Sequence, residues 1–215
     1  MTIAIGEIIK NGVMFDIKNW NREIYKAEEL PATVARLFAL LTSRNIDYLV
    51  VGAVALLSYV TGRNTQNIDF LLTSEELAAM PEITVIDENR NFVRTLFEKL
   101  QVNLLLTHDA FFAQVRKDYS TKRIFREGTL RCVTVEGLVL LKLYALPSLY
   151  GKRQFDKLAI YECDITTLLF NYPAIEQALL VKVLAPHLIA TEIQEIQVSL
   201  DDIQRRLNRF KSFQF

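Results

Sequence analysis

The spacing of apolar residues changes along the chain, and this change limits the fold more than any other feature. Up to about residue 133, short apolar runs of strand length, such as Asn67–Leu72 and Leu100–Leu106, alternate with stretches of helical period. After residue 134 the apolar residues recur only with the helical period. We therefore expect an α+β domain over residues 1–133, of which 1–30 form an N-terminal extension, followed by a helical C-terminal domain over 134–215 that packs on it.

The same patterns predict individual elements. Strands are expected over residues 48–51, 67–72, 83–86, 100–106, 121–125 and 129–133. Helices are expected over residues 31–45, 53–60, 75–80, 109–117, 135–146, 153–170, 173–184 and 191–210. Residues 92–99 fit either period. Ser74 is expected to cap one helix, and Pro147 to end another, because proline lacks the N–H group that a helix interior needs. The apolar stripe of the last helix either closes the core of its domain or docks to another chain.

The composition excludes several classes of function. Lysine plus arginine and aspartate plus glutamate both number 25, so no chain-wide positive charge favours nonspecific DNA binding. No apolar run is long enough to span a membrane, and the N-terminus lacks the basic region of a signal peptide. We therefore expect a cytoplasmic protein with no membrane partner. Cys132 and Cys163 lie far apart without metal-ligand spacing, which indicates two buried, reduced thiols.

Polar residues interrupt two of the predicted strands and indicate a site. Asn67 and Asp69 are two positions apart, so they share one face of their strand, and Asn103 lies in a later strand. A metal-binding protein would keep two carboxylates on that shared face, but here one of them is an amide. The pair Gly52-Ala53 follows the first strand and opens a helix. Because both residues are small, backbone N–H groups there could approach a phosphate.

The residues around these positions resemble a known family. The stretches YLVVGAVA (48–55) and RNTQNIDF (63–70) are similar to the signature of the minimal nucleotidyltransferases, close to the branch that contains the nucleotidyltransferase toxins of abortive-infection systems. That family has Gly-Gly or Gly-Ser after its first strand, Arg-x-Thr-x-Asp-x-Asp on its second, and a third aspartate on a later strand. A helix motif of the family is approximately matched by Glu136, Leu138, Lys142 and Ala145. The resemblance implies a nucleotidyltransferase-like mixed β-sheet with flanking helices, followed by a helical part that walls a cleft.

The resemblance also implies roles for residues of this chain. Asp69 would be the metal ligand. The residues that would bind the nucleotide are Gly52, Ala53, Arg63, Thr65 and Lys142. Asn67 and Asn103 stand where the family has its other two catalytic aspartates.

The loss of two carboxylates would weaken metal binding. A unit charge about 4 Å from a divalent ion interacts with it by about 8 kcal/mol at an effective dielectric of about 20, before desolvation is subtracted. An asparagine oxygen can still ligate a hard cation, but it is neutral. We therefore expect Mg²⁺ to bind weakly, as one ion at most, beside an NTP.

Two functions follow from this pattern, and the first is the one that we expect. In the first, the protein is a catalytically degenerate pseudoenzyme that binds a nucleotide, or a protein partner such as a cognate antitoxin, in the cleft. In the second, it is an active, toxin-like enzyme that moves an NMP from an NTP to a hydroxyl of RNA, protein or a small molecule. The second function needs a carboxylate near Asp69, and three acids from predicted loops could supply it: Asp47, Asp87 and Asp109.

Purely structural roles are open to the same residues. Arg63 and Thr65 can fix the turn before the strand without touching a phosphate. Lys142 can extend to water from an apolar helical face. Asn67 and Asn103 can be ordinary polar residues that face solvent.

Overall fold

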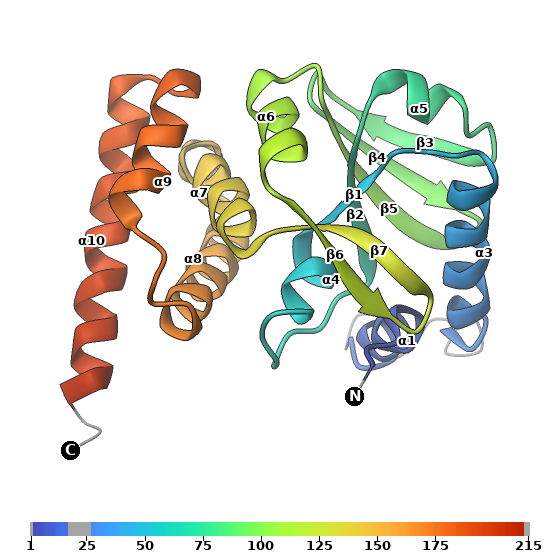
Figure 1. The fold of residues 1–215 in the computed structure, drawn as a ribbon, viewed down its shortest axis with the longest axis horizontal. Helices are drawn as coiled ribbons and strands as arrows, with labels where there is room; N and C mark the ends of the chain where they lie inside the picture. Colours follow the sequence, from blue (N-terminus) through green and yellow to red (C-terminus); the bar gives the residue numbers. More distant parts are fainter. Residues whose placement is uncertain (1, 17–26, 213–215) are drawn as a thin grey trace. The chain divides into compact units, whose positions relative to one another are not determined.

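The computed structural model describes residues 2–16 and 27–212, and the chain divides into two compact units, Met1–Thr134 and Val135–Phe215 (Figure 1). All strands of the described residues belong to the first unit, whereas the second is built from helices. The α+β fold class expected from the sequence, with helices after the sheet, is confirmed.

A mixed sheet of seven strands forms the centre of the first unit, in the order β3-β4-β5-β2-β1-β7-β6. The strands are β1 (Leu49–Val51), β2 (Asn67–Leu72), β3 (Ile83–Glu88), β4 (Phe92–Phe97), β5 (Leu100–Leu106), β6 (Ser120–Phe125) and β7 (Gly128–Val133). β1 pairs with β7, and β2 with β5, in parallel; the other neighbours are antiparallel. All of β1 is buried, as expected of a strand at the centre of a covered sheet.

β4 occupies the segment whose sequence fits two periods. Val93, Thr95 and Phe97 are buried, and the residues between them are half-buried. This alternation is the strand period, and pairing with β5 along the whole of β4 fixes it.

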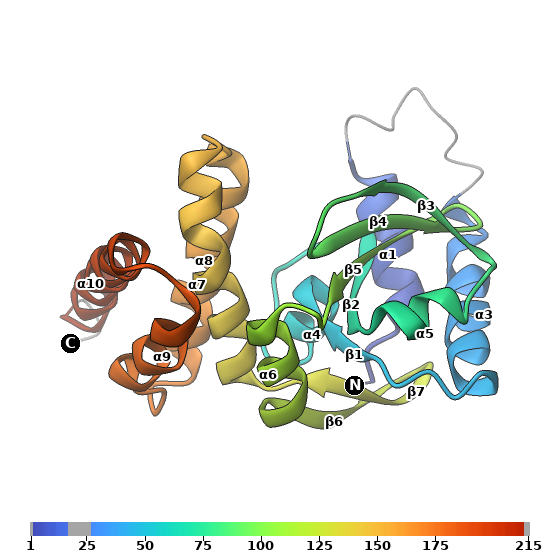
Figure 2. The ribbon, with the colours of Figure 1, turned by 90° about the horizontal axis from the view of Figure 1, so that it is seen from above.

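Helices flank this sheet within the first unit. They are α1 (Ile5–Met14), α3 (Leu30–Ser43), α4 (Gly52–Leu57), α5 (Ser74–Ala78) and α6 (Ala110–Asp118). α1 lies beside α3 (Figure 2). Ile5 and Ile9 of α1 are fully buried, so this part of the predicted N-terminal extension belongs to the core of the unit.

The cap of α5 differs from the sequence expectation. Thr73 is the N-cap, and Ser74 is the exposed first residue of the helix. The Thr73 hydroxyl accepts a hydrogen bond from the N–H of Glu76 (3.1 Å), while the Glu76 carboxylate accepts one from the N–H of Thr73 (2.6 Å). This reciprocal capping box satisfies two N–H groups, which the serine one residue later could not do.

Replacing Thr73 by alanine should lower the free energy of unfolding by about 1 kcal/mol, because the N–H of Glu76 then loses its partner. Ser74→Ala should change it by less than about 0.5 kcal/mol, as is usual for an exposed site. Chemical denaturation of both variants measures the difference. Equal losses in the two variants would contradict the capping box.

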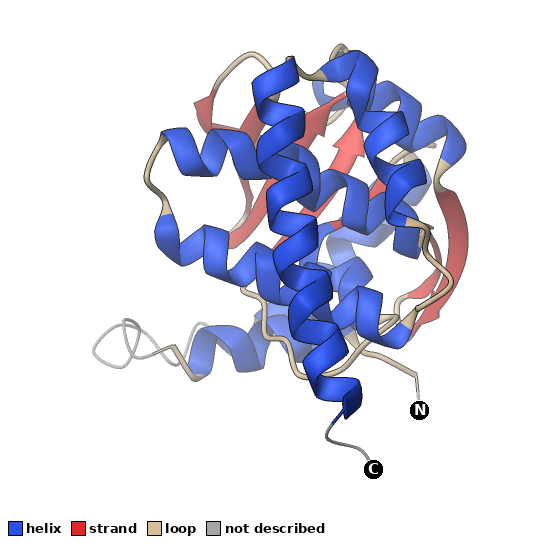
Figure 3. Ribbon diagram, turned by 90° about the vertical axis from the view of Figure 1, so that its left-hand side faces the viewer, coloured by secondary structure: helices blue, strands red, loops and turns tan. Residues whose placement is uncertain are grey.

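The second unit consists of helices that share one core. They are α7 (Val135–Gly151), α8 (Phe155–Asn171), α9 (Gln177–Leu184), the short 3₁₀ helix η2 (Ala185–His187) and α10 (Ala190–Ser212). α10, which ends near the C-terminus in Figure 3, contacts α7, α8 and α9. Four of the five residues of its apolar stripe are buried, since Ile196, Leu200, Ile203 and Leu207 are at most 4% exposed, whereas Ile193 is half-buried. The stripe therefore closes the core of its own unit.

Pro147 does not end its helix, contrary to the expectation. α7 continues through it to Gly151. A proline inside a helix costs about 3 kcal/mol. Leu146 and Leu149, on either side of it, are buried, and each contributes about 2 kcal/mol on burial, so packing on both sides of the proline keeps the helix continuous.

The cysteines also differ from each other. Cys132 is buried in β7, and burial raises its pKa to about 12. Cys163 of α8 is exposed, so the expectation of a buried thiol is wrong there. The core-facing side of α8 is formed instead by its neighbours Asp164 and Ile165.

Within the described residues, none of the helices combines the length and the apolar character that crossing a bilayer requires.

Candidate functional site

The register between β2 and β5 sets the candidate site. These strands are parallel neighbours, and Asp69 of β2 is directly opposite Asn103 of β5. Asn67 lies two residues before Asp69, on the same face of β2. The structure thus brings the three predicted residues Asn67, Asp69 and Asn103 together.

The two asparagines donate hydrogen bonds to the carboxylate between them. Nδ2 of Asn103 is 2.8 Å, and Nδ2 of Asn67 is 3.2 Å, from Oδ1 of Asp69. Both amides therefore turn their N–H groups, the donor ends, toward the negative charge. In a metal site, by contrast, an asparagine ligand turns its side-chain oxygen toward the cation. The arrangement stabilises the carboxylate of Asp69 by amide groups.

Two further side chains hold the amide oxygens. Thr65 Oγ1 donates to Oδ1 of Asn67 (3.0 Å), and Nε2 of Gln101 donates to Oδ1 of Asn103 (3.0 Å). These bonds fix which end of each amide faces the carboxylate. Gln101 was missed by the sequence analysis, although its spacing of two residues from Asn103 on the same strand face was the signal that could have indicated it.

Gly52 brings the start of α4 into contact with the carboxylate. Val51 pairs with Asp69 across β1 and β2, so the next residue, Gly52, lies beside that side chain. Gly52 has a φ of +65°, and a Cβ there would be 2.0 Å from Oδ2 of Asp69. Glycine is therefore required both by the backbone angle and by the close approach. Ala53, the other predicted turn residue, is half-buried in the first turn of α4.

Gly52→Ala should lower the free energy of unfolding by about 2 kcal/mol, since the left-handed backbone alone costs about 1–2 kcal/mol for a residue with a Cβ. The contact with Asp69 Oδ2 adds to that loss. Adding Asp69→Ala to Gly52→Ala should recover the part due to the carboxylate and leave the parts due to the backbone and to the Cβ of residue 69, which would be 2.9 Å away. Urea denaturation of the single and double variants separates the two, and a Gly52→Ala variant as stable as the original chain would contradict both.

The residues predicted to bind phosphates belong to different units. Arg63 and Thr65 lie in the loop before β2, whereas Lys142 lies in α7 of the second unit. Lys142 is 6% exposed, so it does not extend to water. Its Nζ donates to Oδ2 of Asp164 (2.8 Å) and lies 4.5 Å from the centre of the Tyr161 ring. The contacts of Arg63 and Lys142 with a nucleotide remain predictions.

Asp47 does not replace a missing carboxylate. It accepts a hydrogen bond from Nη1 of Arg131 (2.5 Å) and lies 2.9 Å from Nη2 of Arg116. Burial raises the pKa of Asp47, but the hydrogen bond from Arg131 and the charges of both arginines outweigh it and hold that pKa below its usual value. The three side chains border a cavity of about 300 Å³, together with Thr107, Ala113 and Lys117.

The other two candidate acids are engaged elsewhere as well. Asp109 caps α6 by accepting a hydrogen bond from the N–H of Phe111 (2.9 Å). Asp87 of β3 lies 4.0 Å from Nη1 of Arg94. Over residues 2–16 and 27–212, no group of three or more His, Cys, Asp or Glu side chains is arranged to hold a metal ion. Asp69 is thus the carboxylate on which metal binding at this site would depend.

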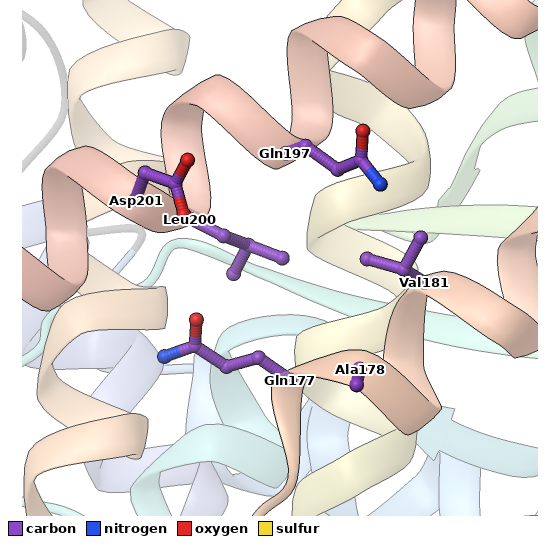
Figure 4. A pocket seen from close by; sticks show the side chains of 6 residues that line it. All are labelled: Gln177, Ala178, Val181, Gln197, Leu200 and Asp201. Atoms are coloured by element: carbon purple, nitrogen blue, oxygen red, sulfur yellow. The ribbon is translucent and has the colours of Figure 1, made fainter.

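The second unit has a pocket of its own between α9 and α10, with a volume of about 290 Å³. It is lined by Gln177, Ala178, Val181, Gln197, Leu200 and Asp201. Figure 4 shows Leu200 and Val181 pointing into it from opposite helices, with the polar ends of Gln177, Gln197 and Asp201 around them. None of the predicted site residues is among these, so the pocket is separate from the candidate site.

Comparison with known proteins identifies the fold. No family model matches the sequence, and no curated protein matches it. Among solved structures, an antigenic nucleotidyltransferase-like protein from Paracoccidioides brasiliensis is similar over 97% of this chain and 95% of its own, with 14% identity and a TM-score of 0.52. The antibiotic-resistance factor ANT(2'')-Ia matches 85% of this chain and 96% of its own, with 11% identity and a TM-score of 0.48. The chain has a nucleotidyltransferase-like fold, as the sequence resemblance implied.

Proposed function

We propose that this protein is a catalytically degenerate nucleotidyltransferase that binds a nucleotide without transferring it. The observation that carries the proposal is the pair of amide donors, from Asn67 and Asn103, on Oδ1 of Asp69. The nucleotidyltransferase-like fold supports it, because the site lies on the two strands to which the sequence resemblance assigns the catalytic aspartates.

Charge is the reason why transfer should fail. Metal-assisted transfer needs cations that bridge the triphosphate and activate the attacking hydroxyl. Divalent ions in such sites are held by carboxylates, and here one carboxylate is already hydrogen-bonded by two amide groups. A cation would have to displace those N–H groups and rotate both amides against their bonds to Thr65 and Gln101.

Nucleotide binding itself does not require that cation. An arginine fork can bind phosphate oxygens in a bidentate way, and Arg63 lies in the loop between α4 and β2 that leads to the site. At Gly52 the carboxylate of Asp69 already occupies the space beside the backbone, so we expect the phosphates to bind at Arg63 rather than at this turn. We therefore expect NTP affinity to depend little on Mg²⁺.

The test is transfer from labelled nucleotides. The protein is incubated with each of the four labelled NTPs, with Mg²⁺ or Mn²⁺, and with cell extract as a source of acceptors. We expect no labelled product from the unmodified chain. Label that the unmodified chain transfers, and that Asp69→Asn abolishes, would overturn the proposal.

Calorimetry of the same preparation supplies the binding measurement. Each NTP is titrated with and without Mg²⁺, and Arg63→Ala serves as the variant expected to weaken binding. Asn67→Asp combined with Asn103→Asp is the matched variant for the transfer assay, and transfer by that variant alone would support degeneracy. If no NTP binds the unmodified chain, the nucleotide part of the proposal is wrong. A protein partner is then the ligand to test in the cleft.

A further inference from the structure

The N-terminal helix α1 touches the loop that carries part of the candidate site. A Cβ on Gly12 would be 2.1 Å from the carbonyl oxygen of Thr65 and 2.8 Å from its carbonyl carbon. Gly12 is buried in this contact. The backbone of α1 and the backbone of the loop therefore meet directly, and any side chain at Gly12 would force one of them to move.

A hydrogen bond fixes the next residue of the same loop. Nε2 of Gln66 donates to Oδ2 of Asp16, just after α1, at 2.6 Å. The other end of α1 is held separately, because the N–H of Gly6 donates to Oε1 of Glu127 in the turn between β6 and β7 (3.0 Å). α1 is thus anchored to the sheet at one end and to the site loop at the other.

We propose that α1 is a positioning element of the candidate site, acting through Gly12 and Asp16. The contact with Gly12 sets the position of Thr65, whose hydroxyl donates to Oδ1 of Asn67. That bond leaves the Asn67 N–H groups facing Asp69. The chain of contacts from α1 to the carboxylate is therefore continuous.

This series of contacts determines whether the site favours or disfavours a cation. While Thr65 holds the amide oxygen of Asn67, the amide presents a donor beside Asp69, which disfavours a cation. If α1 shifts and Thr65 moves with it, the amide of Asn67 can rotate and present its oxygen, which is a ligand for hard cations. α1 thereby keeps the site in its metal-excluding form.

The test is the side-chain amide signal of Asn67 in ¹H–¹⁵N NMR spectra, assigned by its loss in Asn67→Asp. Gly12→Ala should shift this signal. The matched control is Gly6→Ala, whose Cβ would be 2.6 Å from Cα of Pro31 and so strains α1 away from the site loop. Asn11→Ala, at an exposed position of α1, is the neutral control. Both controls should leave the Asn67 signal in place.

Two outcomes would overturn the inference: an Asn67 signal that stays unmoved in Gly12→Ala, or one that moves equally in Gly6→Ala. If Gly12→Ala does not fold, Gln66→Ala takes its place. It removes only the exposed bond to Asp16 and should give a smaller shift in the same direction, whereas no shift would contradict the inference.

The ligand readout rests on the proposed function, but the NMR readout does not. In calorimetry, Gly12→Ala should bind Mn²⁺ measurably more tightly than Gly6→Ala does. The amide signal is recorded without any ligand, so it tests the role of α1 even if the protein binds no nucleotide. Transfer of label by the unmodified chain would contradict the proposed function, but it would not affect the conclusion drawn from the NMR result.

Discussion

The double variant Asn67→Asp, Asn103→Asp should bind Mn²⁺ at least roughly 100-fold more tightly than the unmodified chain. Each restored carboxylate would interact with a divalent ion by about 8 kcal/mol before desolvation. If only about 3 kcal/mol of the combined gain remains after desolvation, the dissociation constant still falls by roughly 100-fold. Calorimetry and Mn²⁺ electron paramagnetic resonance measure the change.

The same variant should be less stable without metal. Asn103 Nδ2 is 2.8 Å from Oδ1 of Asp69, so a carboxylate there replaces an attractive hydrogen bond by the repulsion of two like charges. Mn²⁺ relieves that repulsion and binds only the folded state, so it should raise the melting temperature of the variant far more than that of the unmodified chain.

Single variants and a triple variant with one carboxylate fewer sharpen the result. Asn67→Asp and Asn103→Asp alone should lie between the unmodified chain and the double variant. Adding Asp69→Asn to the double variant returns one amide and should lose much of the gain. Unmodified protein that binds Mn²⁺ as tightly as the double variant would show that the amide groups do not exclude the ion.

The strands that carry the site could be predicted from the sequence because their period leaves little freedom. β2 and β5 begin and end at the expected residues. If the pairing register of either strand shifted by one residue, the buried Phe70 or Leu104 would turn toward solvent and the polar residues would turn inward. The same alternation placed Asn67 and Asp69 on one face, so the members of the site followed from the strand pattern.

The direction of each amide could not be predicted in this way. It depends on Thr65, which the motif assigns to nucleotide binding, and on Gln101, which lies outside the motif; both hold the amide oxygens. A pattern of residue types gives no information on which end of an asparagine faces a neighbour. The contact of Gly12 with Thr65 was missed for a related reason, since residues far apart in sequence meet only once the chain is folded.

Lys142 shows the same limit for a buried charge. Its helical position was predicted, but its partner Asp164 lies on the next helix, and nothing in the spacing of α7 indicates it. Both side chains are less than 10% exposed, 8% for the lysine and 6% for the aspartate. The structural alternative, in which the lysine extends to water, assumed that no carboxylate was in reach.

Breaking this ion pair should have the largest effect on stability. Asp164→Ala should lower the free energy of unfolding by about 3–5 kcal/mol, because it leaves the ammonium group of Lys142 buried without its carboxylate. The Tyr161 ring, 4.5 Å from Nζ, would offset only about 1–2 kcal/mol of such a loss. Urea denaturation followed by far-ultraviolet circular dichroism measures the change.

Replacing Asp164 and Lys142 together shows whether the loss in Asp164→Ala comes from leaving a buried charge unpaired or from losing the contact itself. Asp164→Leu together with Lys142→Met removes both charges and keeps an apolar core of similar volume, so it should recover most of the stability that Asp164→Ala loses. Lys142→Met alone leaves Asp164 as the unpaired charge and should again be destabilising. If Asp164→Ala costs less than about 1 kcal/mol, the value typical of an exposed pair, then water reaches the two side chains and the burial argued for them is wrong.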